Sequence, residues 1–439
     1  MRRRTLRWVG AAIAPMGAVL IGCALVASPA GAVGGPGHSG PGRFLFVSTN
    51  GTDGTNTCTQ PSNPCASIAH AVRVAPSGAT VLVEPGTYTT TSVDLSQPIT
   101  LRALGHVVLT GTGPIFDLFN STSPSSGVVG VTIQGFDFEN VTGTGYNGVI
   151  TVPGYGAGDV AILDNTFSNV SEEAVGYHGN NGLTSPLGTG WRIVGNTVDG
   201  VTGTGRSGMF LGGLSDSVIA DNSITDTHHA GILLTANATT PPANVNNLVV
   251  GNRVSNVPYE GIQVARGTTV SVMGNDVTDA GTACMGSAPP TACGSPGLSS
   301  ASALMLFNAD QSNITVEGNV ATDSYVGLAV GQPPSSGTGP LGTGITVRDN
   351  DFSGDTLAGV ADYAPTGSTS LVAQYNWWGC RGGPSTAAGG CSGVIGTVTF
   401  TPWLTHPPAR GGFFGPGPGI FPAGTFPGRG AAVAESSRH

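Results

Sequence analysis

Four polar residues of different chemistry occupy equivalent places in successive copies of a sequence repeat. Each lies two residues before the Gly or Ala that begins an apolar run: Glu172, Arg206, His229 and Tyr259, with Glu260 following directly. Arginine can neutralise the carboxylate of a uronate sugar and acidify the neighbouring C–H, while histidine or tyrosine moves the proton. These candidate catalytic residues therefore suit β-elimination on a uronate polysaccharide.

Two more polar residues, His178 and Arg266, follow the same apolar runs on their far side and are candidate substrate-binding residues. The alternative interpretation of the Glu–Arg–His column is an ion-pair and hydrogen-bond ladder at a solvated turn. The position of Arg206 in the column depends on its register, because extra residues at 203–205 precede it.

The repeat that carries these residues has two elements. The first is an apolar alternation that ends in Asn, and the second begins with Gly or Ala. The Asn positions are Asn165, Asn196, Asn222, Asn252, Asn275, Asn319, Asn350 and Asn376, and the second element begins at Gly148, Ala174, Gly208, Gly231, Gly261, Ala303, Gly327 and Gly359. The Asn-to-Asn period is 23 to 31 residues, except for 44 between Asn275 and Asn319.

This period predicts a parallel β-helix of eight to ten coils. Each repeat holds about three short alternating strands and cannot bury its apolar face alone, so coils must stack. Asn tolerates the left-handed conformation of a sharp corner, and stacked Asn side chains should hydrogen-bond to one another as a ladder. A leucine-rich repeat lacks its Leu spacing here, and a β-propeller usually needs longer units of about 40 residues.

Both ends of the stack have capping signals. Residues 67–74 predict a short amphipathic helix before a first strand and turn at 79–88, and a cap protects the open β edge. The Gly78–Tyr88 segment and the Asn376–Leu404 segment, with its Asn-Trp-Trp-Gly, Gly-Pro and Pro-Trp-Leu motifs, resemble the right-handed parallel β-helix (pectate-lyase-like) superfamily, in its secreted bacterial members. The resemblance implies an all-β, right-handed parallel β-helix solenoid with an N-terminal cap helix and an irregular C-terminal cap.

The superfamily includes polysaccharide lyases, polygalacturonase-like hydrolases, epimerases, esterases and non-catalytic surface proteins, so the fold does not assign the chemistry. The sequence shows no Asp–Asp pair like that of the hydrolases, and it has no Lys, which excludes lyases with a catalytic Lys. The nearest acidic cluster, Asp349, Asp351 and Asp355, is expected to be a solvated corner. We therefore expect no cofactor, with Ca²⁺ as an alternative that lacks a clear motif.

The chain divides into four segments. Residues 1–32 predict a signal peptide, 33–43 a linker, 44–404 the β-helix domain and 405–439 a disordered Pro/Gly-rich tail. A lipobox-like sequence before Cys23 gives lipoprotein anchoring as a minor alternative to secretion. Since 71 of 439 residues are Gly and only 9% are charged, the composition favours short strands and tight turns over helices.

The other six cysteines fall into three close pairs, as expected of local disulfides in an exported chain: Cys58 with Cys65, Cys284 with Cys293, and Cys380 with Cys391. Their spacing matches no zinc motif, so no metal site is expected. The formal charge of −9 disfavours nucleic acid.

These features predict a secreted monomer without membrane insertion after signal cleavage, whose partner is extracellular polysaccharide or cell-surface glycan. It would bind or process that polymer, as a lyase or a glycoside hydrolase if it is an enzyme. The alternative is a non-catalytic adhesion or structural β-helix protein.

Overall fold

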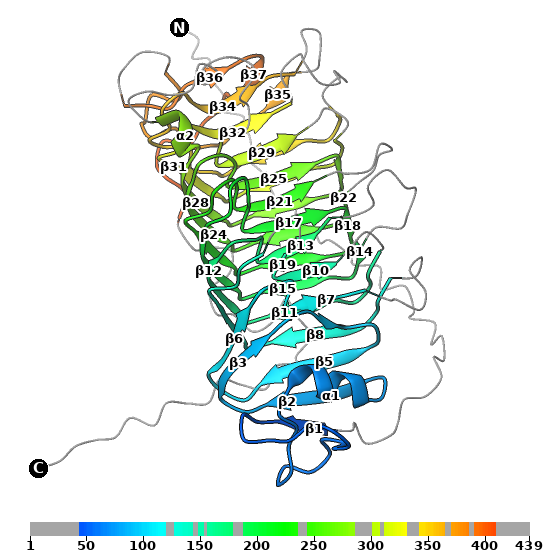
Figure 1. Cartoon of the computed structure of the whole chain (residues 1–439). Coiled ribbons are helices and arrows are strands. Elements are labelled where there is room, and N and C mark those ends of the chain that lie inside the picture. Colours follow the sequence, from blue (N-terminus) through cyan, green and yellow to red (C-terminus); the bar gives the residue numbers. More distant parts are fainter. Residues whose placement is uncertain are drawn as a thin grey trace, which may run out of the picture. The chain divides into compact units, whose positions relative to one another are not determined.

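The computed structural model describes residues 44–409 except 120–126, 144–147, 153–155, 179–187, 236–243, 286–300, 308–310, 332–341, 365–369 and 386–389. Short strands stack coil upon coil into three long parallel sheets (Figure 1). The predicted right-handed parallel β-helix is therefore confirmed. The predicted signal peptide, linker and most of the predicted tail lie outside the described residues.

Most coils contribute one strand to each of the three sheets in turn. The first sheet contains β1 (Phe44–Val47), β2 (Ala79–Val83), β5 (Ile99–Ala103), β8 (Val131–Gln134), β11 (Ala161–Leu163), β15 (Arg192–Val194), β19 (Val218–Ala220), β23 (Leu248–Val250), β27 (Ser271–Met273), β30 (Thr315–Glu317) and β33 (Thr346–Arg348). The second contains β3 (Gly86–Thr90), β6 (Val107–Gly111), β9 (Asp137–Glu139), β12 (Thr166–Val170), β16 (Thr197–Val201), β20 (Ser223–Thr225), β24 (Arg253–Val257), β28 (Asp276–Ala280) and β31 (Val320–Thr322).

The third sheet carries the Gly- and Ala-anchored runs. It contains β4 (Val93–Asp94), β7 (Phe116–Asp117), β10 (Ile150–Val152), β13 (Val175–Tyr177), β17 (Met209–Gly212), β21 (Ile232–Thr235), β25 (Ile262–Ala265), β29 (Leu304–Phe307), β32 (Val326–Val330), β34 (Ala358–Asp362) and β36 (Val394–Ile395). Two small sheets contain β14 (Gly188–Thr189), β18 (Leu214–Ser215), β22 (Asn244–Val245) and β26 (Gly267–Thr268), and β35 (Leu371–Val372) with β37 (Val398–Thr399). The first and third sheets each have 11 strands, more than the predicted eight to ten coils, because the first coils lack the marker Asn.

A continuous Asn ladder joins the coils where the first sheet turns into the second. Each Asn donates from Nδ2 to Oδ1 of the next, as from Asn222 to Asn252 at 2.9 Å. The ladder runs without a break through Asn165, Asn196, Asn222, Asn252, Asn275, Asn319, Asn350 and Asn376. The prediction of a hydrogen-bonded ladder is confirmed.

The predicted reason for Asn at this corner was wrong. The left-handed residue is the one before the ladder Asn, for example Asp221 with φ 53° before Asn222. The Asn side chains instead point inward, are buried, and bond to backbone groups of neighbouring coils. Their role is to satisfy buried polar groups, since an unpaired one is costly.

The Gly and Ala anchors lie where the second sheet turns into the third. A Cβ at Gly208 would lie 2.6 Å from Ile224 Cγ2 and 2.9 Å from the Gly231 carbonyl oxygen, so the corner of this coil has no room for a side chain. Gly148 is one residue out of the predicted register. Ile150 pairs with Val175, so Val149 is the residue that aligns with Ala174.

Helix α1 (Ile68–Val74) is the predicted N-terminal cap, and Ser67 accepts a hydrogen bond from the His70 N–H as its N-cap. At the other end, buried Trp378 packs against Phe352 and Phe400. The short helix α2 (Thr282–Met285) lies in the 44-residue interval. No helix of the described residues is long and apolar enough to cross a bilayer.

Two of the predicted disulfides are present in the described residues, Cys58–Cys65 and Cys380–Cys391. Cys284 is also disulfide-bonded, and its predicted partner Cys293 lies outside the described residues. Disulfides of this kind are typical of exported proteins.

Candidate functional site

The third sheet sets the register of the candidate column. Along it, Val175 pairs with Met209, Met209 with Ile232, and Ile232 with Ile262. The residue three positions before each of these is Glu172, Arg206, His229 and Tyr259, so the four occupy one column. The extra residues 203–205 do not displace Arg206, because a turn in which its N–H bonds to the Gly203 carbonyl absorbs them.

The first half of the column is a buried ion-pair cluster. Arg206 Nε lies 3.1 Å from Glu172 Oε2, and its Nη1 lies 3.6 Å from Glu173 Oε1. All three residues are buried, with Arg206 9% exposed, so the expectation of a solvated turn was wrong. Burial raises the pKa of Glu173 to about 7, against the lowering effect of the Arg206 charge. The Arg206 guanidinium thus forms its ion pairs with carboxylates of its own chain.

The second half of the column is an aromatic pair. The rings of His229 and Tyr259 lie 4.9 Å apart at 36°, and both residues are half-buried. Ser207 Oγ lies 3.3 Å from His229 Nδ1. Burial lowers the pKa of His229, and the charge of His228 lowers it further. The imidazole is therefore neutral near pH 7 and can accept a proton.

An open groove adjoins this aromatic pair. It has a volume of about 480 Å³ and is lined by Val201, Asp226, Thr227, His228, Asn256, Pro258, Tyr259 and Thr282. Tyr259 belongs to both the column and the groove lining, whereas Glu172 and Arg206 belong to the column alone. The groove supplies hydroxyl, amide and carboxylate groups beside one aromatic ring, a combination that suits sugars.

Glu260 is buried next to Tyr259 on the same turn. Its residue is 4% exposed, and its Oε2 has no hydrogen-bond partner among the described residues. Burial raises the pKa of Glu260 to about 7, so near neutral pH it is partly protonated. Glu260 is not among the residues that line the groove.

Replacing Glu260 by glutamine should flatten the pH dependence of stability. The folded-state pKa lies above the ordinary value of 4.5, so the folded chain holds the proton more tightly, and stability falls as pH rises through about 7. At about pH 8, E260Q should be more stable than the parent by on the order of 3 kcal/mol, and at about pH 4, below the unfolded-state pKa, nearly equal to it. Urea unfolding at both pH values measures this. Glu139→Gln on β9 is the matched control, and equal pH profiles of E260Q and the parent would contradict the prediction.

His178 and Arg266 do not form one binding patch. His178 follows β13 and stacks on Phe210 at 4.8 Å, where burial and then the Arg206 charge lower its pKa to about 4. Arg266 follows β25 with φ 48°. Because β13 and β25 are three strands apart in the third sheet, the two residues are separated by about 14 Å at the usual spacing.

An acidic pair that the sequence did not reveal lies at the N-terminal end of the third sheet. Asp94 of β4 pairs in register with Asp117 of β7. Burial and the Asp94 charge raise the pKa of Asp117 to about 6. The expectation that no Asp–Asp pair exists was therefore wrong. These strands precede the first coil that carries the marker Asn. Aligning the first coils with one another by the lengths of their strands could have revealed the pair.

The cluster of Asp349, Asp351 and Asp355 is not a solvated corner. Asp351 is buried and accepts from the Ser353 N–H and hydroxyl, while Asp355 accepts from the Ser324 N–H. Burial raises the pKa of Asp355 well above its ordinary value. Among the described residues, the one set of three His, Cys, Asp or Glu ligand atoms within 4.8 Å of one another lies elsewhere, at the N-terminal cap.

Comparison with known proteins agrees with the fold. The family model "Right handed beta helix region" matches residues 123–291. No curated protein matches the chain. Similar solved structures include the following three. The periplasmic alginate epimerase AlgG has 13% identity and a TM-score of 0.34, over 73% of this chain and 77% of that one. Pectate lyase Pel9A has 14% identity and a TM-score of 0.32, over 84% of this chain and 79% of that one. The catalytic unit of an α-1,3-glucanase from Streptomyces thermodiastaticus has 15% identity and a TM-score of 0.43, over 82% of this chain and 68% of that one. At these identities and TM-scores the similarity says nothing about activity.

Proposed function

We propose that this right-handed parallel β-helix protein is exported, binds a uronate polysaccharide in the groove beside Tyr259, and cleaves it by β-elimination. The observation that carries the proposal is the contact between the rings of His229 and Tyr259, because Tyr259 also lines that groove. A neutral imidazole and a phenol in contact are a base and an acid in one place, next to a surface suited to sugars.

In the proposed reaction, His229 takes the proton from the carbon next to the uronate carboxylate. The electron pair forms the new carbon–carbon double bond, the glycosidic C–O bond breaks, and Tyr259 gives its proton to the leaving oxygen. Asn256 and Thr282 of the groove lining would hold the carboxylate. Arg206 does not fit its predicted role as the carboxylate ligand, because Glu172 and Glu173 occupy it.

The test is to incubate the protein with a panel of uronate polysaccharides and follow the ultraviolet absorbance of unsaturated products. His229→Ala and Tyr259→Phe should each lower the rate at least about 100-fold, the usual contribution of a positioned acid or base. The matched controls are His106→Ala, at an exposed side chain just before β6, and Tyr375→Phe, 52% exposed at another corner. Rates that fall equally in these controls would contradict the proposed roles.

A non-catalytic glycan-binding or adhesion protein is the second candidate. The observation that favours it is the Glu172–Arg206–Glu173 cluster, since the charged half of the column serves the fold. This candidate predicts no unsaturated product on any polymer, with binding retained and weakened by Tyr259→Ala. Product formation that depends on His229 would exclude it.

A further inference from the structure

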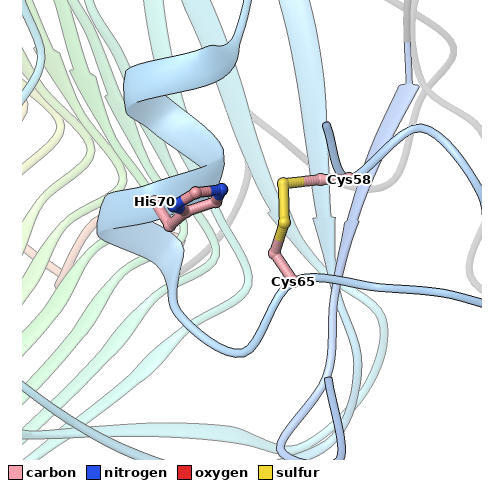
Figure 2. A group of neighbouring side chains, drawn as sticks. All are labelled: Cys58, Cys65 and His70. Carbon is pink, nitrogen blue, oxygen red and sulfur yellow. A yellow bond between two sulfur atoms is a disulfide. The ribbon is translucent and has the colours of Figure 1, made fainter. Parts of the chain in front are cut away.

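The N-terminal cap brings two cysteines and a histidine together outside the candidate site. The ligand atoms of Cys58, Cys65 and His70 all lie within 4.8 Å of one another, and the three residues are buried (Figure 2). In the structure the two sulfur atoms form a disulfide, so they bind no metal in this state. The sequence spacing did not reveal the group because His70 joins it from the first turn of α1, where Ser67 starts the helix.

We propose that this cap is a redox-gated metal site. Once the Cys58–Cys65 disulfide is reduced, the two thiolates and the His70 imidazole bind one soft divalent cation such as Zn²⁺ or Cd²⁺. A phosphine reductant supplies the two electrons and becomes the phosphine oxide, taking its oxygen from water. The disulfide becomes two thiols, and metal binding then displaces their two protons. The cap is closed by a sulfur–sulfur bond in one state and by a metal in the other.

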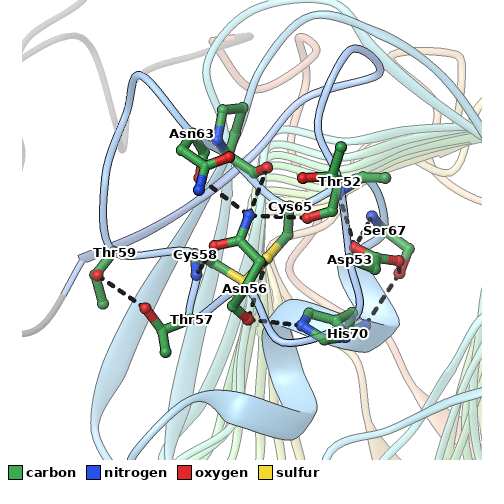
Figure 3. Close-up of a disulfide and its surroundings, with 12 residues drawn as sticks. Thr52, Asp53, Asn56, Thr57, Cys58, Thr59, Asn63, Cys65, Ser67 and His70 are labelled. Atoms are coloured by element: carbon green, nitrogen blue, oxygen red, sulfur yellow. Dashed lines mark hydrogen bonds between the residues drawn. A yellow bond between two sulfur atoms is a disulfide. The ribbon is translucent and has the colours of Figure 1, made fainter.

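The backbone holds both cysteines in place without help from the disulfide. The Phe46 N–H bonds to the Cys58 carbonyl at 2.8 Å, the Cys65 N–H to the Phe46 carbonyl at 2.9 Å, and the Ser48 N–H to the Cys65 carbonyl at 2.9 Å. The Asn56 side chain adds bonds to the carbonyls of Thr52 and Pro64 (Figure 3). After reduction the thiols therefore stay beside His70.

The distances fit a tetrahedral soft metal. Zn–S bonds of about 2.3 Å and Zn–N bonds of about 2.0 Å place ligand atoms roughly 3.5–3.8 Å apart. The His70 nitrogen, within 4.8 Å of both sulfurs, needs to move by about 1 Å, and the two sulfurs must separate by about 1.8 Å once their bond of about 2 Å is reduced. The Asn56 carbonyl, 2.8 Å from His70 Nε2 and 3.9 Å from Cys65 Sγ, offers a fourth oxygen ligand. Two sulfurs, one nitrogen and one oxygen are a donor set that zinc accepts.

Arg73 opposes metal binding, so the proposal predicts the direction in which its removal changes the metal affinity. Its guanidinium Nη2 contacts His70 Nδ1. Because arginine only donates, Nδ1 accepts, and the proton sits on Nε2 and points at the Asn56 carbonyl. Metal binding through either ring nitrogen must break one of these bonds, and Arg73 adds a positive charge nearby. Removing Arg73 should therefore tighten binding.

The experiment titrates Cd²⁺ into the full-length protein, with and without the phosphine, and follows thiolate-to-Cd²⁺ charge-transfer absorbance. The reduced parent should bind one equivalent at this site, and Cys380→Ser/Cys391→Ser should keep it. Cys58→Ser/Cys65→Ser should lose it, and the oxidised protein should not show it. His70→Ala should weaken the affinity at least about tenfold. Arg73→Ala should tighten it several-fold, and the exposed control Arg102→Ala should leave it unchanged.

Three results would overturn the proposal. The first is an undiminished charge-transfer signal in reduced Cys58→Ser/Cys65→Ser. The second is an affinity that neither His70→Ala nor Arg73→Ala changes, which would mean that thiolates alone bind the ion. The third is a reduced parent whose thermal midpoint does not rise with Cd²⁺, since an ion that binds the folded cap must stabilise it. If His70→Ala fails to fold, Arg73→Ala decides the second point.

Discussion

Arg206→Met is expected to destabilise the protein by about 3–5 kcal/mol, because removing one partner of a buried ion pair leaves the other charge uncompensated. Here two carboxylates lose their partner, Glu172 at 3.1 Å and Glu173 at 3.6 Å, and both are buried. Urea unfolding at neutral pH measures the loss.

The pH dependence of that loss identifies its cause. The pKa of Glu173 is already about 7 with Arg206 in place, and without the guanidinium it rises further. A raised folded-state pKa means that stability falls as pH rises through it, so the deficit of Arg206→Met should be largest above about pH 7 and shrink towards about pH 5.

Two variants control for lost packing. The triple variant Glu172→Gln/Glu173→Gln/Arg206→Met should recover most of the stability, because it buries no charge. Replacing the exposed Arg253 of β24 by methionine should change the stability by no more than about 0.5 kcal/mol. A triple variant as unstable as Arg206→Met would show that packing, and not charge, is what Arg206 supplies.

The register of the column could be read from the sequence because Gly or Ala recurs at this corner in most of the coils that carry the marker Asn. Gly208, Gly231 and Gly261 stand where a Cβ would meet the core or the next coil, so each one marks the same structural position. Counting back from such a mark predicts which side chains stack. The count failed at Gly148, where a Cβ would also lie too close, 2.3 Å from the Gly176 nitrogen, although the neighbouring Val149 takes the position that aligns with Ala174.

The burial of those side chains could not be read in the same way. The register determines which residues are neighbours along the stack, whereas the exposure of a side chain depends on how the turns of adjacent coils cover it. Glu172 is packed against the turn of the preceding coil, where a Cβ at Gly143 would lie 2.6 Å from its Cγ. The Asp94–Asp117 pair was missed for a different reason, since its coils carry no Asn mark. His70 was missed because a helix, and not the repeat, positions it.

Substitution in the Asn ladder is expected to cause the second large loss of stability. Asn222→Ala should lower the free energy of unfolding by about 4 kcal/mol or more. The substitution leaves several buried polar groups without a hydrogen-bond partner, at about 1–3 kcal/mol each. Asn222 Nδ2 donates to Asn252 Oδ1 and to the Ile193 carbonyl, both at 2.9 Å. Its Oδ1 accepts from the Asn196 N–H at 3.0 Å and from Asn196 Nδ2 at 2.9 Å. No water can replace these bonds where the ladder is fully buried.

The matched control for this prediction is the exposed Asn256, which bonds across coils to Asp226 at a different corner. Its φ of 52° is one that glycine adopts freely, so Asn256→Gly should cost less than about 1 kcal/mol. Urea unfolding of both variants compares a buried rung with an exposed one. Equal losses would mean that the ladder stabilises through corner geometry and not through buried hydrogen bonds. A loss confined to Asn222→Ala would mean that the stack depends on paired amides inside it, and that each coil is held by its neighbours.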